Sequence, residues 1–242
     1  MAEIRFQCPV CASHLRMGAE ITEVTTETET KERDGLAEEK ENVDSFDLAT
    51  LPAFPCVAIL GKRASGKSEL IKDLVKRLPF DEIHVFDGLQ QNPPPASKFT
   101  AVFKEVTIRQ QNKATSGERG RVVFVFDNCC QEKSLLTSPE LSDLFMNGRH
   151  LGIAVIFAKQ YWGALPPVLR TNLDAVFIFR QYNAESLSKI YRTFNSMRDE
   201  KEFKHYFAVA TENYGAYVYQ MNTNPPRHSQ YRVVTNDVEF KK

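Results

Sequence analysis

Residues 61–68 read Gly-Lys-Arg-Ala-Ser-Gly-Lys-Ser, which matches the spacing G-x-x-x-x-G-K-[ST] of a phosphate-binding loop. The two glycines let the backbone wrap tightly enough for successive N–H groups to point at phosphate oxygens. Lys67 supplies a cation for the β- and γ-phosphates, and the hydroxyl of Ser68 can ligate Mg²⁺. The pattern therefore predicts a nucleotide-binding loop made of Gly61, Lys62, Arg63, Ala64, Ser65, Gly66, Lys67, Ser68 and Glu69.

The flanks of this loop decide whether the match is accidental. Residues 54–60 form a short apolar run of strand length, and residues 69–78 carry apolar side chains at helical spacing before Pro79. A strand, a glycine-rich loop and a helix in this order place the phosphates at the helix N-terminus. A chance match in a surface loop is the alternative, and both flanks argue against it.

Strand and helix patterns alternate through the rest of the chain. We expect helices to begin after Ser138 and Asn183, where capping residues precede helical spacing. Apolar runs predict further strands at 82–86, 121–126, 153–157 and 175–179, an extended segment at 101–108 and a hairpin within 206–220. This alternation predicts an α/β fold with a mostly parallel sheet, helices on both faces and a terminal β-hairpin.

Two polar residues follow buried strands in this pattern. Asp127 follows the strand at 121–126, which is where an acidic residue orients Mg²⁺ together with the hydroxyl of Ser68. Gln160 follows the strand at 153–157, and an amide there can sense the γ-phosphate or hold the attacking water. Each has a plainer alternative, because Asp127 can cap the following turn and Gln160 can face solvent in a loop. The phosphate loop upstream favours the magnesium role for Asp127, whereas position alone leaves Gln160 undecided.

Composition divides the chain into a basic body and an acidic N-terminal part. Residues 1–50 hold 12 of the 31 acidic residues and 5 of the 31 lysines and arginines, so they carry −7 and the remainder carries +7. A basic body suits a polyanionic partner, although such a charge is also common in ordinary domains. We expect a Cys-containing segment at 1–18, an acidic flexible linker at 19–50, a P-loop ATPase domain at 51–222 and a C-terminal tail at 223–242.

Cysteine usage and hydropathy indicate the cellular setting. The cysteines are odd in number, and Cys56, Cys129 and Cys130 lie in apolar surroundings, which is usual for reduced thiols of an intracellular protein. No apolar run is long enough to span a bilayer, and no secretory signal is evident. We therefore expect an intracellular protein without a transmembrane segment.

A candidate metal site lies near the N-terminus. Cys8 and Cys11 are spaced so that their thiolates can bind one tetrahedral Zn²⁺, and His14 can supply a third ligand. No second pair of ligands follows within the N-terminal part, so a complete site needs a distant residue or another subunit. The alternative is a plain N-terminal tail.

Several of these stretches together resemble one family. The phosphate loop, the strand that ends in Asp127, the run Asn147-Gly-Arg-His before the strand that leads to Gln160, and the run Leu165-Pro-Pro-Val-Leu-Arg-Thr-Asn-Leu-Asp are similar to the DNA-packaging ATPases of nucleocytoplasmic large DNA viruses. That family is poxvirus-type in its founding member and belongs to the FtsK–HerA superfamily. The similarity covers residues 54–220, and its other stretches are more specific than the phosphate loop, which all P-loop proteins share.

The resemblance implies a RecA-like core, a homo-oligomeric ring and translocation of double-stranded DNA into a preformed capsid, driven by ATP and Mg²⁺. It also implies residence in the host cytoplasm and the virion, with capsid or inner-membrane viral proteins as partners. It gives catalytic roles to Lys67, Asp127 and Gln160, and it makes Arg170 the arginine that reaches the γ-phosphate of a neighbouring subunit, with Arg149 second. Either arginine can instead form a local ion pair.

The chain departs from this family at the residue after Asp127. The superfamily usually places a second acidic residue there as the base that orients water, whereas this chain has Asn128. An amide cannot accept a proton in the same way, so the base lies elsewhere, with Glu132 or Glu105 as candidates, or is weak.

Two other classes of function remain open at this point. A nucleotide or small-molecule kinase also uses a phosphate loop, but the arginine cluster of a kinase lid does not follow residues 153–157. An ATP-binding assembly protein with little hydrolysis is consistent with Asn128. For DNA contact, the candidates are the basic or aromatic residues Lys113, Arg119 and Trp162, although packing explains Trp162 better.

Overall fold

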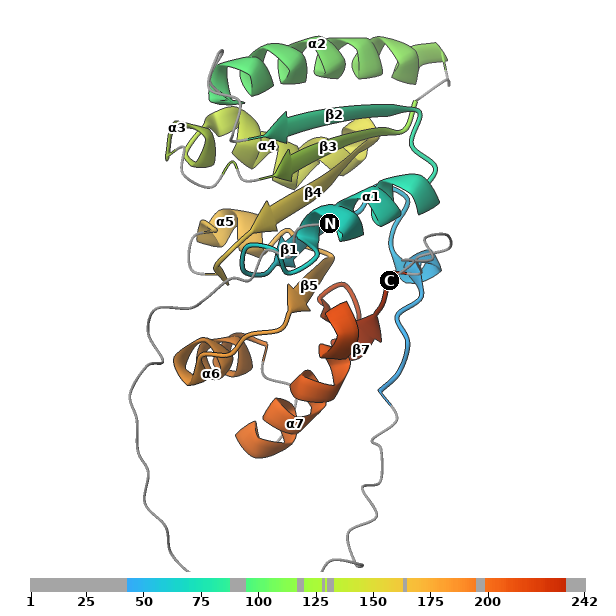
Figure 1. Ribbon diagram of the computed structural model, residues 1–242. Helices are drawn as coiled ribbons and strands as arrows, with labels where there is room; N and C mark the ends of the chain where they lie inside the picture. The colour runs from blue at the N-terminus through green and yellow to red at the C-terminus, as the bar shows by residue number, and fades with distance from the viewer. Residues whose placement is uncertain are drawn as a thin grey trace, which may run out of the picture. The chain divides into compact units, whose positions relative to one another are not determined.

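The structure is a computed structural model that describes residues 43–87, 95–116, 120–127, 129, 133–162, 165–194 and 199–233. These residues form a seven-stranded sheet in the order β2-β3-β4-β1-β5-β6-β7 (Figure 1). The first five strands of this order run parallel, whereas β6 is antiparallel to β5 and β7 is antiparallel to β6. The strands are β1 (Cys56–Leu60), β2 (Glu82–Asp87), β3 (Val122–Asp127), β4 (Ile153–Lys159), β5 (Ala175–Phe179), β6 (Ala216–Gln220) and β7 (Arg227–Tyr231).

Helices lie in the connections between the parallel strands, because two parallel neighbours can be joined only by a crossover. α1 connects β1 to β2, α2 connects β2 to β3, α3 and α4 connect β3 to β4, and α5 connects β4 to β5 (Figure 1). α6 and α7 precede the hairpin of β6 and β7. The helices are α1 (Lys67–Arg77), α2 (Pro95–Ser116), α3 (Lys133–Leu136), α4 (Pro139–Asn147), α5 (Pro167–Arg170), α6 (Ala184–Thr193) and α7 (Glu200–Ala210), with 3-10 turns η1 (Leu48–Thr50), η3 (Gly148–Leu151) and η5 (Glu212–Tyr214).

The two faces of the sheet carry two apolar cores. One face packs against α1 through Leu70 and Leu74, and also against Phe46 from the segment before β1. The other face packs against the remaining helices, for example through Phe103 of α2 and Phe207 of α7. β1, β4 and β5 are buried along their whole length, which explains their continuous apolar sequences.

The two edges of the sheet differ. Along β7, the N–H of Phe46 donates to the carbonyl of Gln230 at 2.7 Å, and the N–H of Gln230 donates to the carbonyl of Asp44 at 2.8 Å. The sequence pattern groups residues 43–50 with the acidic linker, but residues 44–46 of this segment form backbone hydrogen bonds with the edge strand β7. At the other edge, β2 carries Ile83 and Val85, which are 47% and 52% exposed.

Most predicted elements lie where the sequence pattern places them. The strand and the helix around the phosphate loop are confirmed, as are the strands β2 to β5. The two helices with predicted caps also begin as expected. The hydroxyl of Ser138 accepts a hydrogen bond from the N–H of Leu141 at 3.2 Å, and the side chain of Asn183 accepts one from the N–H of Glu185 at 2.8 Å.

The predicted extended segment at 101–108 is wrong, because these residues lie inside α2. Phe99, Phe103 and Val106 are buried at helical spacing, and both phenylalanine rings meet the ring of Phe124 in β3. Aromatic and β-branched residues within the segment imitate a strand. The helical period becomes visible only when Phe99, which precedes the segment, is counted with the others.

The terminal hairpin is confirmed, but its predicted position is wrong. Residues 206–210 end the helix α7, and the hairpin consists of β6 and β7. β7 reads Arg-His-Ser-Gln-Tyr, and only Ser229 and Tyr231 are buried, so this strand has no apolar run to reveal it. β7 also lies within residues 223–242, which the sequence pattern assigns to a tail.

Candidate nucleotide site

The strand order brings the main predicted site residues to one edge of the sheet. β1 leads into the phosphate loop, β3 ends in Asp127, and β4, which leads to Gln160, lies between them. The carboxyl ends of parallel strands share an edge, so these elements face the same end of the domain. In open α/β sheets this edge is where ligands bind.

The phosphate loop folds tightly at the start of α1. Gly66 is the N-cap residue and has a φ of +103°, a left-handed conformation that glycine adopts without strain. A Cβ on Gly61 would lie 2.3 Å from Oγ of Ser65 and 2.9 Å from Cβ of Phe179 in β5. Backbone conformation therefore requires glycine at one position, and close packing requires it at the other.

Lys67 is the buried cation of the loop. The residue is 7% exposed, and its Nζ donates hydrogen bonds to the carbonyl oxygens of Gly61 and Lys62 at 2.8 and 2.7 Å. A buried ammonium is costly unless it is hydrogen-bonded or paired, so these carbonyls help to hold Nζ inside the loop. The cation and the N-terminus of α1 both favour a phosphate at this place.

Ser68 and Asp127 meet beside the loop. Ser68 Oγ donates a hydrogen bond to Oδ2 of Asp127 at 3.0 Å, which joins the start of α1 to the end of β3. The second carboxylate oxygen, Oδ1, is buried and has no hydrogen-bond partner among the described residues. Mg²⁺ takes oxygen ligands and keeps several waters, so a hydroxyl beside a carboxylate with an unpartnered oxygen fits this ion.

A carboxylate that sequence reasoning missed lies on the next strand. Asp87 ends β2 and is the register partner of Asp127 in the parallel ladder of β2 and β3. Register partners lie on the same face of a sheet, about 4.8 Å apart across the strands. The sequence marks Asp87 as a strand end, but only the strand order shows that β2 neighbours β3.

Gln160 lies at the same edge of the sheet as the loop, because Leu60 and Lys159 are register partners and the N–H of Gly61 donates a hydrogen bond to the carbonyl of Lys159 at 3.0 Å. Gln160 is exposed after β4 and lines a cavity of about 480 Å³ together with Trp162 and Ile190. Arg170 ends α5, and its guanidinium carbon lies 5.6 Å from the ring centroid of Trp162. The Trp162 ring also packs against Phe194, with centroids 4.7 Å apart, in agreement with a packing role. An arginine that completes a neighbouring subunit's site need not touch the phosphate loop of its own chain.

Arg149 lies at the opposite edge of the sheet from the loop. Its Nη2 is 2.7 Å from Oδ1 of Asp174, the residue before β5, and Oδ2 of Asp174 accepts the N–H of Cys56 at the start of β1. Both strand starts belong to the amino-terminal edge. The local ion pair that the sequence left open for Arg149 is therefore formed. Burial, and then the Asp174 carboxylate, raise the pKa of the Cys56 thiol, while Arg149 lowers it.

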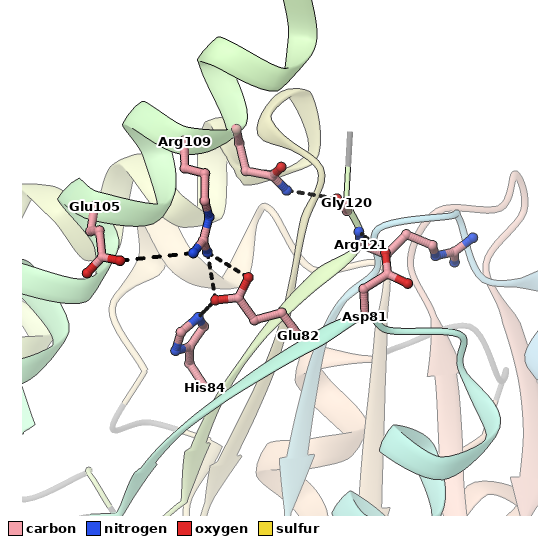
Figure 2. A network of polar contacts seen from close by, with 8 residues as sticks. Asp81, Glu82, His84, Glu105, Arg109, Gly120 and Arg121 are labelled. Carbon is pink, nitrogen blue, oxygen red and sulfur yellow. Dashed lines mark hydrogen bonds and ion pairs between the residues drawn. The ribbon is translucent and has the colours of Figure 1, made fainter. Parts of the chain in front are cut away.

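Glu105 also lies in a network at the amino-terminal edge (Figure 2). Its carboxylate is 4.0 Å from Nη1 of Arg109, and Nη2 of Arg109 donates to both carboxylate oxygens of Glu82, the first residue of β2, at 2.6 Å. His84 contacts the same carboxylate. Burial raises the pKa of Glu82, but the hydrogen bonds from Arg109 and His84 outweigh it and lower the pKa. Glu82 and Asp127 mark opposite ends of neighbouring strands, so this network does not serve the phosphate loop.

The remaining candidates divide into described and undescribed positions. Lys113 is exposed on α2, and Glu69, the last residue of the predicted loop, forms an exposed ion pair with Lys72 at 2.7 Å. Within the described ranges, no cluster of three or more His, Cys, Asp or Glu side chains suits a metal ion, and no helix has the length and apolar character of a membrane span. Other predicted residues lie outside the described residues, namely Cys8, Cys11, His14, Arg119, Asn128, Cys130 and Glu132.

Two viral proteins are similar to this chain in sequence. The chain is 31% identical over 175 residues to the uncharacterized protein 075L of invertebrate iridescent virus 6. This match covers 66% of this chain and 68% of protein 075L. The chain belongs to the family of this protein. It is also 30% identical over 173 residues to the uncharacterized protein 015R of frog virus 3. This match covers 65% of this chain and 54% of protein 015R, so the chain spans about half the length of that relative. No family model matches the chain.

Solved structures share the fold at low identity. The genome packaging NTPase B204 of Sulfolobus turreted icosahedral virus 2, in complex with AMPPCP, matches with a TM-score of 0.54 and 16% identity over 75% of this chain and all of B204. ATPases 2 and 3 of EssC from Geobacillus thermodenitrificans match with a TM-score of 0.54 and 14% identity over 76% of this chain and 41% of EssC. The chain therefore shares its fold with known P-loop ATPases, as the phosphate loop predicts.

Proposed function

We propose that this chain is a viral ATPase that translocates double-stranded DNA into a preformed capsid. The observation that carries the proposal is the 3.0 Å hydrogen bond between Ser68 Oγ and Asp127, with the second oxygen of Asp127 left unpartnered. A chance match to the motif in a surface loop would not explain why Ser68 pairs with a carboxylate at the end of β3, which is two strands away from β1 in the sheet. The viral relatives and the fold shared with a genome packaging NTPase support the more specific role.

Each site residue has a part in ATP hydrolysis under this proposal. The backbone N–H groups of residues 61–68 bind the phosphates, and Lys67 offsets their charge. Ser68 and Asp127 hold Mg²⁺, which when bound neutralises charge on the phosphate oxygens. Gln160 orients the attacking water, and Glu132 accepts its proton. Arg170 acts on the site of the neighbouring subunit, a contact worth about 10³–10⁵ in rate in other nucleotide hydrolases.

The partners follow from the same proposal. Arg170 can act in this way only if subunits assemble, so a homo-oligomeric ring is part of the proposed machine. The charge of +7 beyond residue 50 favours binding to the DNA backbone, which is independent of sequence and weakened by salt. Capsid or inner-membrane viral proteins dock the ring, and the protein acts in the host cytoplasm and in the virion. A bound Zn²⁺ at Cys8, Cys11 and His14 remains part of the proposal.

The test measures phosphate release with and without long duplex DNA, together with negative-stain images of the protein with DNA and a non-hydrolysable ATP analogue. We expect DNA to raise the ATP turnover of the wild type but not that of Lys67→Ala, and we expect rings in the images. Equal inactivity of both proteins with DNA and visible rings would refute the motor. Turnover that requires a small phosphoryl acceptor instead of DNA would indicate a kinase.

A second candidate is an ATP-binding assembly protein with little hydrolysis. Asn128 favours it, because this residue stands where related ATPases usually carry an acidic residue. Under this alternative, the wild type binds ATP and forms rings, yet releases phosphate no faster than Lys67→Ala. The same two measurements therefore separate the two candidates.

A further inference from the structure

The phosphate loop opens into a cavity of about 530 Å³ on the side away from Asp127. Its walls are residues 64–69 of the loop, together with Phe179, Asn213, Tyr214 and Val233. β1 is followed on this side by β5 and β6, while β3 with Asp127 lies on the other side. β6 is antiparallel to β5, and its first residue, Ala216, pairs with Phe179. The turn before β6 therefore lies at the carboxyl-terminal edge of the parallel strands, where the loop also lies.

This turn is conformationally costly. Asn213 and Tyr214 have φ values of 48° and 60°, so two successive residues other than glycine adopt the left-handed conformation. Asparagine tolerates this region, but for a bulky residue it costs about 1–3 kcal/mol. Gly215 follows with no room for a side chain, since a Cβ there would lie 2.4 Å from the carbonyl oxygen of Ala210. The turn is therefore held by its surroundings, and it fixes the backbone from which the Tyr214 side chain projects.

Packing within the protein does not account for a tyrosine at this position. Tyr214 is 76% exposed, whereas Phe179 is 2% exposed and lies beneath the loop. A Cβ on Gly66 would be 3.2 Å from Cε1 of Phe179 and 3.9 Å from Cδ1 of Tyr214. The Tyr214 ring therefore stands beside the first turn of α1, where the phosphates bind, with one face turned to the cavity or solvent.

We propose that Tyr214 is the surface on which the base of the bound nucleotide stacks. This inference rests on the proposed nucleotide site and adds the recognition of the nucleoside to it. Ser68 and Asp127 would bind the terminal phosphates through Mg²⁺ on the β3 side of the loop. The nucleoside, at the other end of the phosphate chain, would then lie toward β5 and β6, where the cavity is. Stacking of a base on an aromatic ring is worth about 1–3 kcal/mol by alanine substitution and tolerates any base. Asn213, next to it, adds an amide that can both donate and accept hydrogen bonds.

The chain supplies a matched control for this proposal. Tyr182 is also 76% exposed and stands near the loop, with Nζ of Lys62 5.5 Å from its ring centroid. Tyr182 is not among the residues that line the loop cavity. Tyr214→Ala and Tyr182→Ala thus remove the same side chain at equal exposure, and Tyr214→Phe keeps the ring but removes the hydroxyl.

The experiment measures Kd by calorimetry for ATPγS and for inorganic tripolyphosphate, with Mg²⁺, on the full chain. We expect Tyr214→Ala to weaken ATPγS binding by about 5- to 150-fold, the equivalent of 1–3 kcal/mol, and to leave tripolyphosphate binding within about twofold. Tyr214→Phe and Tyr182→Ala should bind both ligands as the wild type does. A loss of tripolyphosphate binding equal to the loss of ATPγS binding would overturn the proposal, because Tyr214 would then support the loop and not the base.

Unchanged binding of ATPγS to Tyr214→Ala would also overturn the proposal and would leave the proposed ATPase intact. A wild type that binds neither ligand, like Lys67→Ala, would instead refute the nucleotide site itself and the stacking surface with it. The two failures are thus distinguishable.

Discussion

Replacing Arg149 with alanine should destabilise the protein without removing a catalytic group. Asp174 lies with its side chain 4% exposed, and Arg149 provides its charged partner at 2.7 Å. Without Arg149, the buried carboxylate of Asp174 keeps one hydrogen bond, which the backbone N–H of Cys56 donates. Breaking a buried ion pair in this way costs about 3–5 kcal/mol. The Arg149 side chain is 51% exposed, however, so water replaces part of its effect and the cost falls to about 1–2 kcal/mol.

Urea and thermal unfolding measure this cost. For a domain of this size, about 1–2 kcal/mol lowers Tm by about 2–8 °C. The decisive comparison is a double-mutant cycle with Asp174→Asn, because a neutral amide needs no counter-charge. In that background, Arg149→Ala should cost less than about 0.5 kcal/mol. Phosphate release per folded molecule should be retained in Arg149→Ala and lost in Arg170→Ala.

Two results would refute this reasoning. Arg149→Ala could unfold at the same urea concentration as the wild type, or it could lose the same stability whether residue 174 is Asp or Asn. Either result would show that the ion pair does not stabilise the buried carboxylate. Loss of turnover in Arg149→Ala at full stability would in addition return Arg149 to the role of the arginine that acts between subunits.

Three further predictions concern the loop, the magnesium site and the hairpin. Gly61→Ala should weaken ATPγS binding in calorimetry by about 10- to 100-fold, because the alanine Cβ would lie 2.9 Å from Cβ of Phe179. Binding as tight as in the wild type would contradict the packing argument. Asp127→Asn should lower phosphate release by about a hundredfold, and unchanged release over a Mg²⁺ titration would exclude Asp127 from the ion. Burial lowers the pKa of His228, which contacts Tyr217, to about 4, so the unfolded chain binds the proton first as the pH falls. Urea unfolding should therefore show stability falling by about 1–2 kcal/mol between pH 6.5 and 4, and His228→Gln should remove this contribution to the slope.

The elements that flank the candidate site were easier to predict from sequence than the rest of the fold. The phosphate loop and Asp127 are local signals, because each sits at the end of an apolar strand whose period is visible in a few residues. Asp87 also ends an apolar strand, but nothing in the sequence around Asp87 or Tyr214 places either residue beside the loop. Their place beside the loop depends on which strands are neighbours and on the antiparallel direction of β6, and these are properties of the whole sheet.

The two errors in the fold have different physical origins. The residues of α2 resemble an extended segment because Phe103 and Val106 favour strands as isolated residues, while the packing of Phe99 on β3 favours the helix. β7 escaped detection because an edge strand with mostly polar residues is held by backbone hydrogen bonds to β6 and to residues 44–46. Tertiary contacts decided the case of β7, whereas the helical period of α2 is present in the sequence once Phe99 is counted with Phe103 and Val106.

The most direct test of the central claim is the ATP-dependent displacement of a third strand from duplex DNA, which reports movement along the duplex. The wild type should displace the third strand when ATP and Mg²⁺ are present, and Lys67→Ala should not. The account also predicts that displacement weakens as salt rises, because the contacts are to phosphates. A wild type that forms rings and hydrolyses ATP on DNA, yet leaves the third strand in place, would contradict the claim that this chain is a DNA motor.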